Sequence, residues 1–160
     1  MNADASPPSL QLARQCAEAM WAEDTASKNL GMRLVTVAPG CAVVTMTATP
    51  EMVNGHGIVH GGFLATLADS AFAVACNTYG DVTVAAGFDI VFVAPGRLGD
   101  ELTAGATERA RYGRSGIYDV AVRATNRTGK TRVLAEFRGR SRSLGRPILA
   151  AGERTTEEST

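Results

Sequence analysis

The stretch that decides the fold is GGFLATLADSAFAVACNTYG, residues 61–80. It contains no proline and is apolar almost all round, which is typical of a helix buried on most of its sides. Gly80 is a natural residue to follow a helix end, so we expect one long helix over residues 61–79. Asp69 is the only charged residue of this helix, and burying its carboxylate without a partner would be costly. The stretch therefore predicts the centre of the core and a candidate functional group.

The sequence around this helix has the β-branched residues and glycine-containing turns of strands. Six strands are expected, at residues 32–37, 42–47, 83–93, 101–111, 116–126 and 131–143. A shorter amphipathic helix is expected from Leu10 to about residue 22, with Ser9 as its N-cap. Two strands before the long helix and four after it, joined by short links, predict an α+β fold with an antiparallel sheet packed on the helix.

Length and charge limit the organisation and the partners of the chain. A chain of 160 residues has the length of a single domain, and 16 Lys and Arg balance 16 Asp and Glu. This neutrality argues against a nucleic-acid partner, which would require a basic excess. We expect residues 9–147 to form one domain, between a flexible N-terminus at residues 1–8 and a flexible C-terminal tail at residues 148–160.

Cysteine usage and the lack of a targeting segment indicate the compartment. The three cysteines are Cys16, Cys41 and Cys76. They are odd in number, far apart and in no CxxC pair, which is typical of free thiols in a reducing compartment. The sequence shows no signal peptide and no apolar run long enough to span a membrane. We therefore expect a cytoplasmic protein without a membrane partner.

The residues at the start of the long helix, NGHGIVHGG at 54–62, are suited to binding an oxyanion. They bring backbone N–H groups without helical partners, the positive end of the helix dipole and little side-chain bulk to one point. We expect the amides of Gly61 and Gly62 to be unpaired there.

Asp69 shares one helix face with Thr66 and Ser70, and these three residues form a polar strip. One interpretation is structural: Asp69 accepts hydrogen bonds from its neighbours and only fixes packing. The other is catalytic: Asp69 and the Gly61 amide act on the same carbonyl. Eight residues at 1.5 Å rise separate them by ~12 Å along the axis, and the tilt of the side chain recovers only a small part of that. The catalytic interpretation therefore requires a dimer in which the helix N-terminus of one subunit faces Asp69 of the other.

No motif in the sequence points to a metal or an organic cofactor. In residues 55–60, GHGIVH, a histidine stands where the dinucleotide fingerprint needs its third glycine. His56 and His60 are four residues apart, but the HExxH pattern and a third candidate zinc ligand are missing. We therefore expect no cofactor.

Residues 54–73, NGHGIVHGGFLATLADSAFA, closely resemble the signature of the phenylacetic-acid-degradation acyl-CoA thioesterases, a hotdog-fold family. The likeness extends from about residue 30 to residue 145, through the segments 89–96, 99–102, 113–119 and 137–141. The resemblance implies a curved antiparallel sheet of five to six strands wrapped around the central helix. It also implies a homodimer joined edge to edge as the catalytic unit, and a homotetramer of two such dimers.

The resemblance also implies roles for residues of the site. The Gly61 amide polarises the thioester carbonyl, and Asp69 of the facing subunit acts as nucleophile or as general base for water. His60 and Asn54 orient the thioester and the water or loop around it. No metal or organic cofactor is implied.

Six further residues are expected to contact the substrate. They are Gly62, Thr66, Ser70, Arg114, Arg138 and Arg140. Related enzymes often place the attacking water with a serine or threonine where this chain has Gly87. The alternatives are that a hydroxyl of the polar strip takes over this role or that the role is absent, and we assign it to no residue. Coenzyme A is polyanionic, and Arg138 and Arg140 alternate on one face of the last strand, as a phosphate-binding pair would. The alternative is a solvated strand face.

We therefore predict an acyl-CoA thioesterase. It would hydrolyse aryl-acetyl-CoA, such as phenylacetyl-CoA, or medium-chain acyl-CoA to the free acid and CoA. Two alternatives are open on the same fold. One is an enoyl-CoA hydratase or dehydratase with His60 as base, and the other is a non-catalytic acyl-CoA-binding protein.

Overall fold

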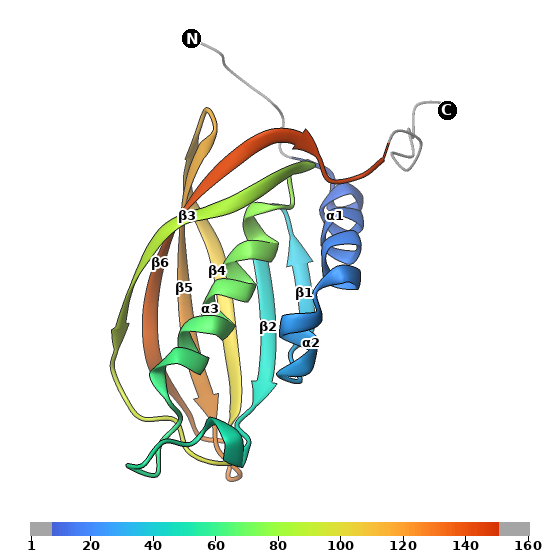
Figure 1. The fold of residues 1–160 in the computed structure, drawn as a ribbon. Helices are drawn as coiled ribbons and strands as arrows, with labels where there is room; N and C mark the ends of the chain where they lie inside the picture. The colour runs from blue at the N-terminus through green and yellow to red at the C-terminus, as the bar shows by residue number, and fades with distance from the viewer. Residues whose placement is uncertain (1–7, 151–160) are drawn as a thin grey trace.

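The computed structural model describes residues 8–150, in which a single sheet curls around one main helix (Figure 1). Of the predicted flexible ends, residues 1–7 and 151–160 lie outside the described residues. The chain still packs on the domain beyond residue 147, because the Leu149 side chain is buried.

The elements match the predicted order. The helices are α1 (Leu10–Glu23), α2 (Thr25–Asn29), the short 3-10 helix η1 (Pro50–Met52) and α3 (Gly61–Cys76). The strands are β1 (Arg33–Ala38), β2 (Cys41–Thr47), β3 (Asp81–Phe92), β4 (Glu101–Tyr112), β5 (Ser115–Thr125) and β6 (Thr131–Pro147). All neighbouring strands are antiparallel, in the order β1-β2-β4-β5-β6-β3. The α+β prediction is therefore confirmed.

Helix α3 lies across the concave face of the sheet, and its apolar side chains form the centre of the core (Figure 1). The Phe72 ring packs against Tyr118 of β5 and Phe137 of β6, with ring centroids 5.5 and 5.8 Å away. Gly139 of β6 faces Phe72 so closely that a Cβ there would lie 2.9 Å from the ring. The sheet therefore closes tightly around α3 at β5 and β6.

The helices differ from the prediction in two ways: one ends earlier, and one was not expected. α3 ends three residues before residue 79, because the Asn77 side chain binds the backbone of Thr83 instead: Nδ2 donates to the carbonyl at 2.7 Å and Oδ1 accepts from the N–H at 2.8 Å. α2 was not predicted, because five residues are too few to show an apolar period. Asp24 caps it by accepting a hydrogen bond from the Ser27 N–H at 2.9 Å.

Strand β3 is an open edge of the sheet. It pairs only with β6, and its apolar side chains are exposed, by 65% at Val91 and 53% at Phe92. At the opposite edge, α1 packs against β1. An exposed apolar edge strand is typical of a surface that meets another chain.

Candidate active site

His60 caps α3 and takes up one of its free amides. Its Nδ1 accepts a hydrogen bond from the Gly62 N–H at 2.9 Å, which corrects the prediction that the amides of both Gly61 and Gly62 are unpaired. The Gly61 N–H makes no hydrogen bond to any residue between 8 and 150. A neutral imidazole whose Nδ1 accepts a hydrogen bond carries its proton on Nε2. The Nε2–H of His60 is therefore left as a hydrogen-bond donor. The helix start therefore presents one unpaired amide, that of Gly61.

The Phe92 ring lies directly against Gly61. A Cβ on Gly61 would lie 2.7 Å from Phe92 Cζ, so any larger residue there would require the Phe92 ring to move. Phe92 was not predicted as a site residue, because nothing in the sequence shows that the end of β3 reaches the start of α3. The one available signal was the Pro95-Gly96 pair, which marks where the strand ends.

Asn54 orders the loop that leads into α3. Its Oδ1 accepts hydrogen bonds from the N–H groups of His56 at 2.9 Å and Ile58 at 3.4 Å. The Val59 N–H then donates to the Gly96 carbonyl at 3.0 Å, which ties the loop to the segment after β3. Asn54 therefore fixes the loop in which His60 and the helix start are presented.

A cavity of about 700 Å³ opens beside these groups. It lies between the start of α3 and residues 92–96, and Ile58, Leu64 and Phe92 give it an apolar wall. Ligand sites are typically hollows of this kind, with few polar groups that fix orientation. The unpaired Gly61 amide is such a group, so the cavity could take an acyl chain whose carbonyl lies at Gly61.

Asp69 is partly buried on α3, and its Oδ1 has no hydrogen-bond partner. Among the described residues it is the only buried side-chain nitrogen or oxygen in that condition. The Thr66 hydroxyl donates to the Gly62 carbonyl at 2.8 Å, and the Ser70 hydroxyl bonds to the Ser27 hydroxyl at 3.0 Å. Loss of solvent by burial raises the pKa of the Asp69 carboxyl. The polar strip therefore does not satisfy Asp69 Oδ1.

Gly61 and Asp69 are held on one continuous helix. At 1.5 Å per residue, their backbones lie ~12 Å apart along its axis. A single carbonyl cannot contact both groups within one protomer.

Arg138 and Arg140 lie on the outer face of the sheet. Gly139, between them, faces α3, so their side chains point the other way. Arg138 makes two hydrogen bonds to Asp119, from Nε at 2.7 Å and from Nη2 at 2.9 Å. Arg140 pairs with Asp89. A role for these arginines in substrate binding stays a prediction. In the protomer each already pairs with a carboxylate, although Asp119 also pairs with Arg109, at 3.1 Å.

Arg114 lies at the far end of α3. Its Nε donates to the Ser143 carbonyl at 2.8 Å, and it lines a cavity of about 150 Å³ together with Cys76, the last residue of α3. That helix end is ~22 Å from Gly61 along the axis. The structure therefore does not bring Arg114 to the Gly61 cavity of the same protomer.

Residues 8–150 contain neither a metal-ligand cluster nor a membrane-spanning helix. Within that range no group of three or more His, Cys, Asp or Glu side chains could hold a metal ion. None of the helices in the same range is both long enough and apolar enough to cross a membrane.

Comparisons of the sequence find related enzymes. The family model of the thioesterase superfamily matches residues 56–140, which include Gly61 and Asp69. The acyl-coenzyme A thioesterase PaaI of Escherichia coli (strain K12) is 45% identical over 134 residues, which are 84% of this chain and 93% of that protein. A putative esterase of Deinococcus radiodurans is 39% identical over 111 residues, which are 69% of this chain and 73% of that protein.

Comparisons with solved structures lead to the same E. coli protein as the sequence comparison. The E. coli PaaI protein from the phenylacetic acid degradation operon matches with a TM-score of 0.81 and 43% identity, over 87% of this chain and 99% of that chain. A mutant of the phenylacetic acid degradation protein PaaI from Thermus thermophilus matches with a TM-score of 0.69 and 36% identity, over 76% of this chain and all (100%) of that chain. The predicted hotdog fold is confirmed. A sheet curled around one helix, the glycines at that helix's start and these matches together show that the chain belongs to the thioesterase superfamily.

Proposed function

We propose that the protein is an acyl-CoA thioesterase, which converts an acyl-CoA and water into a free acid and CoA. The observation that carries the proposal is Asp69 Oδ1, a buried carboxylate oxygen without a hydrogen-bond partner among the described residues. Natural proteins rarely leave a buried polar atom unsatisfied unless the site has another use for it. The E. coli relative, named as an acyl-coenzyme A thioesterase, supports the same reaction.

The reaction uses groups from two protomers. The thioester carbonyl lies at the Gly61 N–H of one protomer, where the amide and the helix dipole stabilise the negative charge that develops on oxygen. Asp69 of the second protomer either takes a proton from the attacking water or attacks the carbonyl itself. The tetrahedral intermediate then breaks its C–S bond, and CoA leaves as a thiolate that takes up a proton. In the covalent route, water afterwards hydrolyses the acyl-aspartyl anhydride.

His60 and Asn54 act as positioning residues. The Nδ1 of His60 is occupied by the Gly62 N–H, so its Nε2–H is left to orient the thioester. Asn54 fixes the preceding loop through its bonds to His56 and Ile58. The same geometry argues against the hydratase alternative, because a histidine that already accepts at Nδ1 and is protonated at Nε2 has no free lone pair to act as a base.

The acyl group occupies the apolar cavity next to Gly61. The cavity is large enough, at about 700 Å³, for an aryl-acetyl or medium-chain acyl group. The Phe92 ring, which lies over Gly61, offers a face on which an aromatic acyl group can stack. We propose phenylacetyl-like thioesters as the first substrates to test.

The catalytic unit is a homodimer joined through the open edge of β3. The exposed apolar side chains of β3, including those of Val91 and Phe92, would be buried in this dimer interface. β3 begins near one end of α3 and ends near the other (Figure 1). A homotetramer of two such dimers and a cytoplasmic location both stay predictions.

The decisive experiment measures the release of free thiol from a panel of acyl-CoA esters by the wild type and by Asp69→Asn. We expect turnover by the wild type and a loss of about hundredfold or more in the variant, because removing a general base or nucleophile costs at least that much. Thermal unfolding of both proteins controls for folding. Consumption of enoyl-CoA without thiol release would indicate the hydratase, and binding of acyl-CoA without either change would indicate a binding protein.

A further inference from the structure

The loops β3–β4 and β5–β6 meet beside the apolar cavity and form a second hollow of about 440 Å³. We call this hollow, lined by Arg97, Gly99, Asp100, Arg127 and Arg132, the loop notch. Pro95 lines both the notch and the Gly61 cavity, so the two hollows adjoin along the segment that follows β3. The two hollows are therefore neighbours on the surface.

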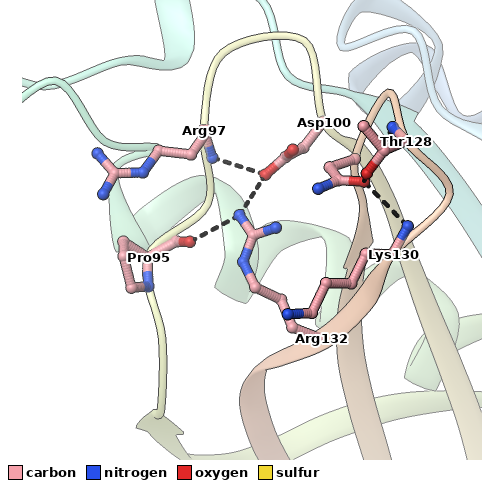
Figure 2. A network of polar contacts seen from close by, with 7 residues as sticks. Pro95, Arg97, Asp100, Thr128, Lys130 and Arg132 are labelled. Atoms are coloured by element: carbon pink, nitrogen blue, oxygen red, sulfur yellow. Dashed lines mark hydrogen bonds and ion pairs between the residues drawn. The ribbon is translucent and has the colours of Figure 1, made fainter.

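The floor of the notch is fixed by a buried ion pair (Figure 2). Asp100 is only 4% exposed, and its Oδ2 accepts from Arg132 Nη2 at 2.6 Å and from the Arg97 N–H at 2.8 Å. Arg132 Nη2 also donates to the Pro95 carbonyl at 3.1 Å. Figure 2 shows the Arg97 guanidinium pointing away from Asp100, so that carboxylate neutralises Arg132 but not Arg97.

The second wall of the notch is an ordered turn between β5 and β6. The Oδ1 of Asn126 accepts hydrogen bonds from the Thr128 N–H at 3.0 Å and the Lys130 N–H at 2.9 Å. Arg127, inside this turn, reaches across to the β3–β4 loop, where its Nη2 would lie 3.3 Å from a Cβ on Gly99. The turn therefore brings Arg127 to the same hollow as Arg97.

The notch carries unbalanced positive charge. Three arginines and one carboxylate line it, which leaves an excess of two charges, and Lys130 stands in the same turn. No ion pair with any residue between 8 and 150 is formed by Arg97, by Arg127 or by Lys130. The whole chain has a formal net charge of zero, so this excess is a local feature. It indicates a site for an anion.

We infer that the loop notch binds the phosphate groups of the coenzyme A moiety, with Arg97 and Arg127 as the residues that contact them. The inference rests on the proposed function, because it requires the acyl end of the thioester to occupy the adjoining Gly61 cavity. The phosphates of coenzyme A lie at the end remote from the thioester, beyond an uncharged arm. The planar guanidinium of arginine matches phosphate oxygens with two parallel hydrogen bonds.

This site differs from the one expected from the sequence. Arg138 and Arg140 are held by Asp119 and Asp89 on the outer face of the sheet. A phosphate that bound there would have to displace a carboxylate from each arginine. At the notch no carboxylate has to be displaced from Arg97 or Arg127.

The test compares phenylacetyl-CoA with phenylacetyl-N-acetylcysteamine, which has the same acyl group and thioester but no phosphate. Arg97→Ala, Arg127→Ala and the double variant are measured beside Arg146→Ala, a matched control in which an exposed arginine at the far end of β6 is removed. For the double variant we expect the ratio of kcat/KM for the CoA ester to kcat/KM for the truncated ester to fall about tenfold, mainly through KM. The loss should shrink as salt is raised, because salt screens exposed charges. Arg97→Lys should retain part of the kcat/KM for the CoA ester that Arg97→Ala loses.

Two outcomes would overturn the inference. The first is an unchanged ratio in the double variant, either because neither ester is affected or because both lose activity equally, as damage to the catalytic site would cause. The second is a selective loss of activity on the CoA ester in Arg138→Ala and Arg140→Ala instead, which would place the phosphates on the outer face of the sheet. If the wild type hydrolyses neither of these esters nor any other acyl-CoA of the panel, the proposed function fails. Calorimetric titration with free coenzyme A then still tests the notch: weaker binding by the double variant supports it, and equal binding overturns it.

Discussion

At the scale of single residues, the proposed site depends on one backbone group and one side-chain group that have no hydrogen-bond partner among residues 8–150. They are the Gly61 N–H and Asp69 Oδ1. Their surroundings differ: the amide lies at the positive end of a helix, whereas the carboxylate loses solvent on a mostly apolar helix. The first is suited to stabilising negative charge, and the second to accepting a proton.

The pH dependence of the reaction tests the role of Asp69. Burial raises the pKa of this carboxyl above its ordinary value of 3.8, and a base or nucleophile must be ionised. We therefore expect kcat/KM to fall as the pH is lowered through a pKa above 3.8. Rate measurements against pH with phenylacetyl-CoA would show this limb. A limb at or below the ordinary carboxyl pKa would contradict it.

The Gly61 amide can be tested with a matched pair of substitutions. Gly61→Pro and Gly61→Ala both add a Cβ, but only proline removes the N–H, and proline suits the first position of a helix. Both are made together with Phe92→Ala, because a Cβ at Gly61 would otherwise lie 2.7 Å from the Phe92 ring. We expect kcat to fall by about a hundredfold or more in the proline variant relative to the alanine variant, as for loss of an oxyanion donor. Equal kcat values would exclude the amide.

The sequence could predict part of this site. The separation of Gly61 and Asp69 follows from the helix rise alone, so the proposal that two protomers share the site can be made from the sequence. The pairing of the Gly62 amide was not, because His60 is not one of the usual capping residues. The position of Phe92 over Gly61 depends on where β3 ends in space, and no local pattern carries that information.

At the scale of elements, the apolar and β-branched patterns predicted all six strands, since tertiary packing agrees with local preference there. The differences lie where side chains bind the backbone. Asn77 stops α3 early through its two hydrogen bonds to Thr83. Such bonds join residues on separate elements, so they are not visible as a periodicity.

The open edge of β3 leads to a prediction at this scale. Val91→Lys places a charge on the exposed apolar edge, where burial against a second copy would be costly. We expect the variant to shift from dimer towards monomer and to lose thioesterase activity in proportion, as measured by sedimentation and thiol release. The control is Val35→Lys on β1, the opposite edge strand, where the side chain is 55% exposed. A fully active monomer of Val91→Lys would contradict the prediction.

At the scale of the whole molecule, each proposed active site takes its amide from one protomer and its carboxylate from the other. One protomer cannot bring the two groups together, because both lie on the same continuous helix, ~12 Å apart along its axis. A two-fold axis creates two equivalent sites, each with the Gly61 of one protomer and the Asp69 of its partner. Activity is then a property of the pair.

This arrangement predicts that two inactive variants restore each other. One is Asp69→Asn and the other is Gly61→Pro with Phe92→Ala. In a mixed dimer, one site combines both defects, while the other has Gly61 and Phe92 from the first variant and Asp69 from the second. If the protomers are exchanged at equal concentrations, half of the dimers are mixed and half of their sites are intact, so we expect about a quarter of the wild-type thiol release. Mixtures that stay at the sum of the two separate activities, after mass spectrometry has shown that mixed dimers formed, would place both groups in a site within one protomer.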